Sequence, residues 1–587
     1  MHLLNISTRR ILLGVWAALA LPVGAAAPDN HVDQVEQGRR IYREGVLPSG
    51  APLSGARFDN SMVAGAQAAC VNCHRRSGMG AVEGDIQVAP INSRFLFAPA
   101  DDKAMATMDP RFGKKMNRRH DPYSDATLAD AIRRGVNNSG RAMNVMMPHY
   151  ALNEADMAAL AAYLKQLSPQ WSPGVGTDKI RFATVVAPGV EPARRKVFLD
   201  MMRGAVTQKN SSTLPGRRHM VSPAEMILRT ERAWELEVWE LQGAPETWTA
   251  QLEAYYRRQP VFAVVSGLSN GTWEPVHDFC EREQVPCWFP SVDLPPATPQ
   301  AFYPLYFSRG VALEAEVLAK HLLAGKSRPR RLLQVYRDNE VGRGAAQALK
   351  HALAGSDVAL AERALSDQEN VSGEMLAGIQ EGDAVMFWLR PTDLAKLDKV
   401  APPRKALPFF SARLSGAEHG PFPAAWKNRA RLVYPYELPE KRAANLTYFH
   451  AWLKSRNLPL VDEPLQSEVY FALNFLTDTL AEMLHNLYRD YLLERAEDMI
   501  GRRESGKAED EARDRAMLLP TVAMPMKPGM GMPVNMPEQF GKRQGTTVYP
   551  RLTLGQGQRF ASKGGYIVRF AGGDSDKLVA ESDWIIF

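Results

Sequence analysis

Cys70-Val71-Asn72-Cys73-His74 is the most informative run of residues in this chain. It has the C-x-x-C-H pattern, in which two thiols attach a haem through its vinyl groups and the following imidazole binds the iron. A thioredoxin-like redox pair would need neither the histidine nor this surrounding sequence. A zinc site needs four nitrogen or sulfur ligands, and the other cysteines lie about two hundred residues away. The motif therefore predicts one covalent haem c on Cys70 and Cys73, with His74 on the iron.

Helical patterns flank this motif. Residues 35–44 favour a short helix, and Asn153 is expected to cap a helix that runs to Leu167 with one apolar face. With Ala131-Ile132-Arg133-Arg134-Gly135, Gly140-Arg141 and the run from Met147-Pro148 to Leu152, this region resembles a small monohaem cytochrome c. The resemblance implies an all-α domain over residues 30–170 and Met147 as the sixth iron ligand. Met143, Met146, His149 and His120 are its rivals, and core filling is the other role for these methionines.

Residues 1–26 have the features of an export signal: Arg9 and Arg10, an apolar run from Ile11 to Val23, and small residues for cleavage. The apolar run is short for a membrane anchor, which needs ~20 residues. The twin-arginine route is the alternative to general secretion, but haem attachment requires an unfolded chain outside the cytoplasm. We therefore expect a periplasmic protein with no membrane span after signal cleavage.

Composition fits a folded chain of several domains, with 587 residues of which 45% are hydrophobic. The net charge of +6 is small and dispersed, which argues against nucleic-acid binding but allows docking to an acidic redox partner. Lys114, Lys115, Arg118 and Arg119 could rim the haem, or they could belong to a solvated loop. The Pro- and Gly-rich residues 168–176 mark a domain boundary, and we place the linker at 171–178.

Beyond this linker, short apolar runs alternate with helical patterns, which predicts parallel sheets covered on both faces. The runs are 180–186, 261–266, 331–336 and 383–389, with another that starts at Cys287. Residues 179–587 resemble the type I periplasmic solute-binding proteins, the amino-acid and amide binders of ABC importers. The resemblance is carried by Ala187-Pro188-Gly189, the segments 264–267 and 285–291, Asp338 to Gly344, and Arg559 to Tyr566. It implies an α/β fold of two lobes with a ligand cleft between them.

Ligands of open α/β sheets bind at the carboxyl ends of the strands. That rule nominates a set of candidate cleft residues: Ser269, Asn270, Ser291, Asp293, Arg390 and Arg413, with Gly267, Leu268, Thr392 and Ser411 beside them. Ordinary capping or surface roles are the alternative for each. The family's amino-acid binders hold the ammonium group with an acidic side chain, which the sequence does not place here. The arginine at 413 instead suits a small organic ligand that is anionic or aromatic.

Two further features stand outside the motif and the cleft. Cys280 and Cys287 are close in an exported chain, so we expect a disulfide, with two buried thiols as the alternative. A Met-rich insertion at about 500–545 begins with the charged run 502–515, which favours a helix or disorder, and its methionines follow that run. Its thioethers could bind copper as Cu(I), or the segment could be a loop over an apolar groove. The methionines are Met517, Met524, Met526, Met530, Met532 and Met536.

The sequence thus favours a periplasmic c-type cytochrome that transfers single electrons to or from a dehydrogenase or another cytochrome. The solute-binding-like domain would dock that partner or bind a small ligand. One alternative is a solute-binding protein or sensor in which the haem reports redox state. The other is a haem-dependent oxidoreductase that acts on a ligand in the cleft. A six-coordinate iron has no open position, and no nucleophile–base pattern stands out, so the chain is not expected to be an enzyme.

Overall fold

The computed structural model describes residues 30–83, 86–99, 121–212, 232–296, 298, 301–325, 328–404, 406–517, 547–572 and 575–586. The predicted export signal, the basic residues 114–119, His120 and all of the Met-rich segment after Met517 lie outside these ranges. Among the described helices, none is long and apolar enough to cross a membrane. The chain divides into two units, one of Met1–Asn72 with Tyr123–Gln166 and one of Cys73–Pro122 with Leu167–Phe587. We describe each by itself.

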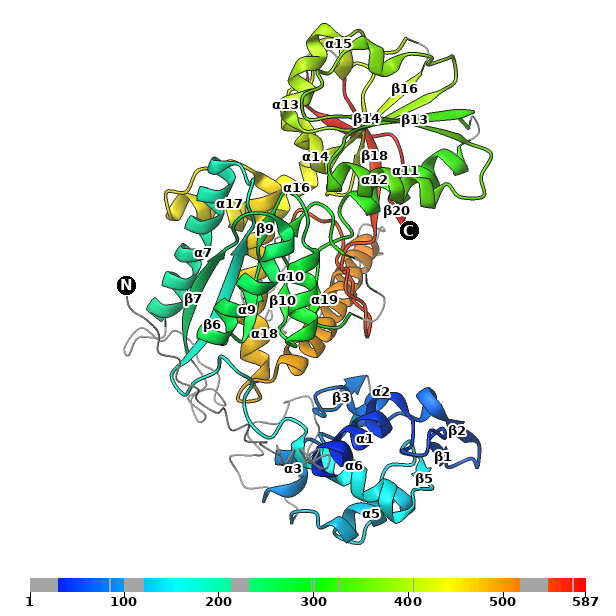
Figure 1. Ribbon diagram of the computed structural model, residues 1–587, viewed down its shortest axis with the longest axis vertical. Helices are drawn as coiled ribbons and strands as arrows, with labels where there is room; N and C mark the ends of the chain where they lie inside the picture. The colour runs from blue at the N-terminus through cyan, green and yellow to red at the C-terminus, as the bar shows by residue number, and fades with distance from the viewer. Residues whose placement is uncertain are drawn as a thin grey trace, which may run out of the picture. The chain divides into compact units, whose positions relative to one another are not determined.

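The core of the first unit is a crossing of two helices (Figure 1). Helix α1 (Asn30–Glu44) packs against α6 (Glu154–Gln166), and α5 (Asp125–Arg134) lies beside α6. The crossing depends on Gly38, because a Cβ there would lie 2.0 Å from the Ala159 carbonyl oxygen. As predicted, Asn153 begins α6, and its side-chain oxygen accepts the Asp156 N–H at 2.8 Å.

The all-α expectation is wrong in one respect, because this unit also contains a small antiparallel sheet. Its strands β1 (Ser54–Ala56), β2 (Met62–Ala64) and β5 (His149–Tyr150) pair in the order β2-β1-β5. These strands are two or three residues long, too short to produce an alternating hydrophobic pattern in the sequence. The sheet places the end of the Met147-Pro148 loop beside β1, with Tyr150 opposite Gly55.

The second unit begins with residues that follow the C-x-x-C-H motif. A hairpin of β3 (Ala81–Glu83) and β4 (Ile86–Val88) precedes α3 (Ser93–Phe97), whose first turn is capped by Asn92. The predicted linker is packed against this unit rather than extended away from it. Trp171 donates to the His485 carbonyl at 2.9 Å, and the Arg232 guanidinium lies 4.5 Å from its ring centroid.

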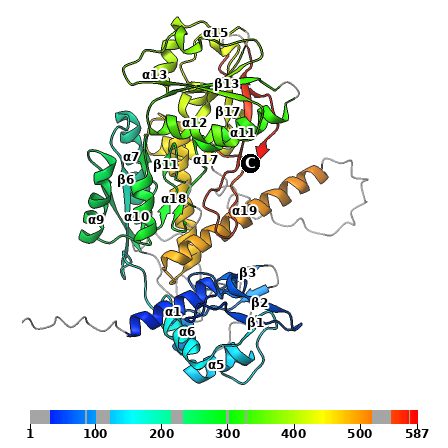
Figure 2. The ribbon, with the colours of Figure 1, turned by 45° about the vertical axis from the view of Figure 1, so that its right-hand side comes forward.

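The rest of the second unit forms two α/β lobes, as the alternation of strands and helices predicted (Figure 1). The first lobe has a seven-stranded parallel sheet in the order β11-β9-β6-β8-β10-β12, with β7 on the other side of β6. Its strands are β6 (Lys179–Val186), β7 (Ala233–Glu240), β8 (Ala263–Val265), β9 (Leu268–Ser269), β10 (Cys287–Trp288), β11 (Ser291–Val292) and β12 (Pro304–Leu305). Its helices are α7 (Pro192–Ser212), α9 (Trp248–Arg258), α10 (Glu274–Arg282), α17 (Thr447–Ser455), α18 (Glu463–Met483) and α19 (Arg489–Met517). Figure 2 shows α19 as one long helix.

The second lobe has an eight-stranded mixed sheet in the order β14-β13-β15-β16-β17-β18-β19, with β20 also paired to β18. The strands β13 to β17 are parallel, and β18 closes the sheet antiparallel to β17. They are β13 (Arg331–Arg337), β14 (Ala359–Leu365), β15 (Ala384–Trp388), β16 (Leu407–Ser411), β17 (Arg431–Tyr434), β18 (Gly564–Phe570), β19 (Leu578–Ala580) and β20 (Ile585–Ile586). The main helices are α11 (Val311–Ala324), α12 (Glu340–Ala352), α13 (Pro391–Leu394), α14 (Ala412–Ser415) and α15 (Ala424–Lys427), whereas α16 (Pro439–Asn445) packs against α17 of the first lobe.

Three segments cross between the lobes. The first crossing segment (306–310) links β12 to α11, the second (435–438) follows β17, and the third (547–563) leads into β18. The first and third pair with each other, because Tyr306 N–H donates to the Arg559 carbonyl at 2.8 Å and Ala561 N–H donates to the Tyr306 carbonyl at 3.1 Å. Two lobes joined by such crossings can move as rigid bodies about the segments that join them.

Candidate functional site

The C-x-x-C-H motif forms a single helical turn. A 3₁₀ turn (Gly65–Ala68) leads into α2 (Val71–His74), and the Asn72 amide donates to the Ala66 carbonyl at 2.8 Å. The Cys70 side chain is half-buried and Cys73 is exposed. The helical turn is the geometry that lets two thiols three residues apart and the next imidazole face one ligand.

The imidazole of His74 is oriented by the backbone. Its Nδ1 lies 2.9 Å from the Ala89 carbonyl oxygen, so Nδ1–H donates there and Nε2 is left as the metal-binding nitrogen. Burial lowers the pKa of His74, although this carbonyl partly opposes the shift. The neutral imidazole is the form that binds iron. Two thiols and one oriented, neutral imidazole are the donor set that a c-type haem needs, so these residues fit the cofactor.

The candidates for the sixth ligand differ in their surroundings. Met147 is half-buried in the loop before β5, where its N–H donates to the Asn144 carbonyl at 3.1 Å. Met146 has a relative exposure of 58%, which suits a surface residue better than a haem ligand. Met143 is half-buried and His149 is exposed. Met147 belongs to the first unit and His74 to the second, so the pairing of the two remains a prediction from the sequence.

A second cluster joins the two lobes, and it contains most of the predicted cleft residues. Asp293 follows β11 of the first lobe and is buried. Its Oδ2 accepts a hydrogen bond from Arg390 Nη2 at 2.7 Å, and its Oδ1 accepts one from Arg413 Nε at 3.2 Å. Burial alone would raise the pKa of Asp293, but the two arginines of the second lobe outweigh it and hold the pKa below its usual range.

Arg413 reaches further into the first lobe. Its Nη2 donates to the Val292 carbonyl at 2.8 Å, and its Nη1 lies 3.5 Å from Glu468 Oε1 on α18. Ser291 donates to the other oxygen of Glu468 at 2.6 Å, and the Tyr549 hydroxyl donates to Oε1 at 2.5 Å. We call Asp293, Glu468, Arg390 and Arg413 the interlobe clamp, because its charged groups pair across the lobes.

The two remaining predicted cleft residues are adjacent in the chain but have different partners. Asn270 accepts a hydrogen bond from Arg194 Nη1 at 2.7 Å, and its carbonyl accepts one from Arg390 Nη2 at 2.9 Å. Ser269 instead closes its own turn, donating to the Thr272 carbonyl at 2.9 Å and accepting the Gly271 N–H at 3.1 Å. The structure thus brings Asn270, but not Ser269, to the interlobe clamp.

Glu314 of α11 lies against the clamp as a buried acid. Its Oε1 accepts the Arg413 backbone N–H at 2.9 Å, and Oε2 shares a hydrogen bond with Ser411. Burial raises the pKa of Glu314 to about 8 despite these hydrogen bonds. At neutral pH the group is therefore largely a neutral carboxylic acid. The clamp then balances two arginines against two carboxylates.

A pocket of about 280 Å³ lies in the second lobe, at the carboxyl ends of β13 and β15. Arg390 and Thr392, both named from the sequence, line it together with Arg337, Trp388 and Lys396. The next two strands in the chain lie on opposite sides of β13, with β14 on one side and β15 on the other. Open α/β sheets bind ligands at such a switch point. Arg337 is bonded to both oxygens of Asp393, at 3.0 and 2.6 Å, and Arg390 is bonded to Asp293, so Lys396, at 4.0 Å from Asp393, is the least engaged of the three cations.

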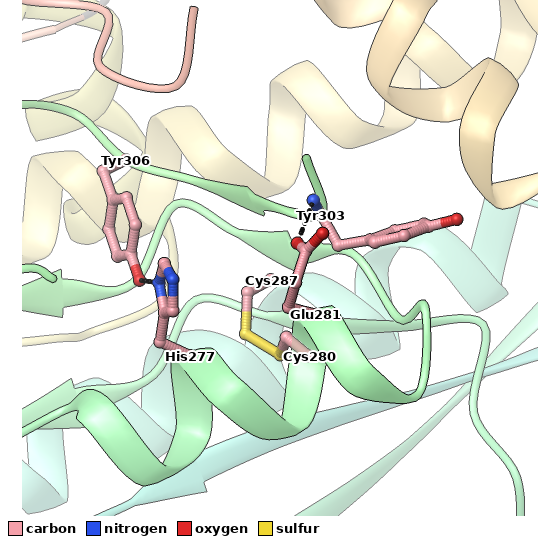
Figure 3. The surroundings of a disulfide bond; sticks show 6 residues. All are labelled: His277, Cys280, Glu281, Cys287, Tyr303 and Tyr306. Atoms are coloured by element: carbon pink, nitrogen blue, oxygen red, sulfur yellow. Dashed lines mark hydrogen bonds between the residues drawn. A yellow bond between two sulfur atoms is a disulfide. The ribbon is translucent and has the colours of Figure 1, made fainter. Parts of the chain in front are cut away.

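The pair Cys280 and Cys287 forms a disulfide between α10 and β10 (Figure 3). Beside it, His277 is buried and its Nδ1 lies 2.9 Å from the Tyr306 hydroxyl. Burial lowers the pKa of His277, which keeps the ring neutral. The Met-rich segment after Met517 lies outside the described residues, so Cu(I) binding there stays a prediction from the sequence.

Residues 64–168 match the family model of cytochrome c. This part of the chain is therefore a cytochrome c domain, and such a domain implies covalently bound haem c. The match begins later than the predicted boundary at residue 30, although α1 packs on α6 within the same unit. No relative was found among curated protein sequences.

Solved structures similar to the chain include a branched-chain amino-acid ABC transporter protein of Thermus thermophilus with bound valine. It is 10% identical, covers 70% of this chain and 98% of its own, and has a TM-score of 0.48. A possible leucine/isoleucine/valine-binding protein of Rhodopirellula baltica is 12% identical, with coverages of 69% and 96% and a TM-score of 0.46. A substrate-binding periplasmic protein of Ralstonia solanacearum is 10% identical, with coverages of 68% and 100% and a TM-score of 0.45. The two-lobed description of the second unit rests on its own sheets and crossings. The chain thus joins a cytochrome c domain to a two-lobed α/β unit.

Proposed function

We propose that this protein is an exported electron carrier with one haem c. Cys70 and Cys73 hold the haem, and His74 and Met147 are its axial ligands. The observation that carries the proposal is the hydrogen bond from His74 Nδ1 to the Ala89 carbonyl, which leaves Nε2 for the iron. The second unit docks a periplasmic redox partner or binds a small organic ligand that regulates the transfer.

The ligand pair determines the chemistry that the haem supplies. A thioether is a soft, neutral ligand that favours ferrous iron, so His/Met ligation raises the reduction potential. It also fills the sixth position, which closes the iron to substrates and favours one-electron transfer. The chain's part is to orient the imidazole and to hold the Met147 loop through its pairing with β1.

An optical redox titration of the haem-loaded protein tests this proposal, with Met147→Ala as the variant and Met146→Ala as the matched control. The wild-type ferric spectrum should show the red charge-transfer band of thioether-ligated haem. Met147→Ala should lose that band, bind CO and have a lower midpoint potential, because the soft ligand is gone. Met146→Ala should behave as wild type, since its side chain is mostly exposed.

Two results would contradict the proposal. If Met147→Ala kept the charge-transfer band, another residue would be the sixth ligand. If the wild-type protein bound CO readily, the iron would have an open position and the oxidoreductase alternative would be favoured.

The pocket in the second lobe supports a second function, that of a binding protein or sensor for a small molecule. Arg390 and Lys396 favour an organic anion, and Trp388 offers an aromatic surface. A panel of small carboxylates and aromatic acids should raise the unfolding free energy by RT ln(1 + [L]/Kd), about 2.7 kcal/mol at one hundred times Kd. If no compound of the panel changes the melting temperature, the second unit is better described as a docking scaffold.

A further inference from the structure

The residues that directly follow the haem motif are bound to helix α19. Arg75 adopts a left-handed backbone conformation, with φ of 65°, which is uncommon for a residue other than glycine. This conformation ends α2 immediately after His74. The Arg75 side chain then pairs with Glu497 at 2.5 Å, and both side chains are largely buried, with exposures of 11% and 4%.

Two more contacts continue this attachment. Ser77 N–H donates to Glu494 Oε1 at 2.9 Å, and its hydroxyl donates to Oε2 at 2.5 Å. Arg76 lies 3.5 Å from Asp490. The three acids have spacings of four and three residues, so they lie along one face of α19 and form what we call the acidic stripe.

The acidic stripe also holds the segments that join the two lobes. Glu497 Oε1 accepts hydrogen bonds from Arg559 Nη2 at 2.5 Å and from the Gly557 N–H at 3.1 Å, both in the third crossing segment. The backbone carbonyl of Arg559 in turn accepts a hydrogen bond from the Tyr306 N–H of the first crossing segment. One buried carboxylate therefore binds the residue next to His74 with one oxygen and the interlobe connection with the other.

A parallel route runs through the aromatic pair before the first crossing segment. The Tyr303 hydroxyl donates to Asp490 at 2.6 Å, and the Arg76 guanidinium lies 4.3 Å from the Phe302 ring centroid. Glu281, next to the disulfide, fixes this pair by accepting the backbone N–H of Phe302 at 2.9 Å and that of Tyr303 at 3.0 Å. Figure 3 shows the bond to Tyr303. The pair is thus held from the disulfide side while its rings face Arg76.

We propose that Glu497 is a positioning residue that couples the position of the two lobes to the haem, through Arg75 on one side and Arg559 on the other. Rotation of the lobes moves the crossing segments, and the shared carboxylate transmits that movement to the residue beside the iron ligand. By linkage, a change of haem state acts back on the lobes. This inference rests on the proposed haem function and goes beyond it by naming the residue that connects the haem to the cleft.

The experiment perturbs the cleft and measures the response at the haem. Arg390→Ala removes one cross-lobe contact of the interlobe clamp, and the midpoint potential of the haem-loaded full chain is then compared with wild type. The same change is made in a Glu497→Gln background. Asp498→Asn is the matched control, because Asp498 lies next to Glu497 on α19 but pairs with Arg495 and Arg502 of the same helix.

We expect Arg390→Ala to shift the midpoint potential in the wild-type and Asp498→Asn backgrounds, and the shift to be clearly smaller with Glu497→Gln, where only the route through Arg76 and Asp490 remains. A purely structural role of Glu497 would leave the shift unchanged, and that result would overturn the inference. A second result would also overturn the inference. It is an unchanged midpoint potential in Arg390→Ala protein whose crossing segments exchange hydrogen faster than in wild type, which shows that the lobes have opened.

Hydrogen exchange also separates this inference from the proposed function. Exchange at Tyr306 and Ala561 reports the crossing segments whether or not haem is present. Preparations without haem absorption would refute the proposed function, whereas haem-loaded protein with equal shifts in both backgrounds would refute only the coupling. Glu497→Gln should by itself speed exchange at these two amides, because Arg559 loses its charged partner; unchanged exchange would also overturn the inference.

Discussion

The buried acid Glu314 should make the stability of the second unit depend on pH, and Glu314→Gln should remove that dependence. The side chain is fully buried, and burial raises its pKa from 4.5 to about 8. In the unfolded chain the same group titrates near its usual value. Between these two values the folded protein binds one more proton than the unfolded chain.

The sign and the size of the effect follow from this difference. A group whose folded pKa is raised contributes most below the unfolded pKa, and its contribution is lost as pH rises through the folded pKa. Each unit of difference corresponds to 1.36 kcal/mol, so the wild-type unfolding free energy should fall by roughly 5 kcal/mol in total through this group, and most of the fall should lie between pH 4.5 and 8. Glutamine keeps the shape and the acceptor oxygen for the Arg413 N–H but does not titrate.

Urea unfolding at several pH values, followed by tryptophan fluorescence of the second unit, measures the difference. Glu314→Gln should be more stable than wild type above pH 8, and the gap should close toward pH 4.5. Glu374→Gln is the control, because it makes the same substitution at an exposed position of the same lobe. Parallel profiles of Glu314→Gln and wild type would show that Glu314 is ionised in the folded state and would refute its description as a neutral acid beside the clamp.

Two further predictions concern stability. Reduction of the Cys280–Cys287 disulfide, or its replacement by two serines, should lower the unfolding free energy by about 2.5 kcal/mol, from the loop-entropy relation for a separation of 7 residues. Urea unfolding with and without reductant measures this change, and an equal urea midpoint in both conditions would contradict it. Gly38→Ala should destabilise the first unit by about 1–3 kcal/mol, because the new Cβ meets a backbone oxygen that cannot move aside. Gly204→Ala in α7 is its control and should be neutral or slightly stabilising, since the nearest atom to its new Cβ is 3.9 Å away; equal effects of the two variants would argue against a tight crossing of α1 and α6.

Features set by local sequence were predicted well. The Asn153 cap and the apolar strand runs each depend on a few neighbouring residues, and β6, β13 and β15 begin within one residue of the predicted positions. Asp293, Arg390 and Arg413 were named because they follow strand ends, which a parallel sheet brings to one edge. Ser269 follows the same rule but turns back on its own loop, because a serine hydroxyl readily bonds to a nearby backbone group.

The residues that the sequence did not reveal are those positioned by distant contacts. Glu468 and Glu314 lie inside helices, where an acidic residue has the sequence signature of an exposed position. Only the packing of α18 and α11 against the lobes shows that they are buried. Glu497 was hidden for a similar reason, since its partners Arg75 and Arg559 are separated from it by 422 and 62 residues.

The charged groups of the interlobe clamp already pair with one another, and this pairing limits the kind of ligand that the cleft could accept. An ammonium group needs a carboxylate, but Asp293 and Glu468 are both already paired with Arg413. Either pair would have to break, leaving a buried arginine with fewer partners at a cost of several kcal/mol. An anion has a different position available at Lys396, which has an exposure of 49% and lines the pocket of the second lobe beside Arg390. Within the proposed binding function of the second unit, the pairing of the clamp is therefore more compatible with an anion than with an amino acid.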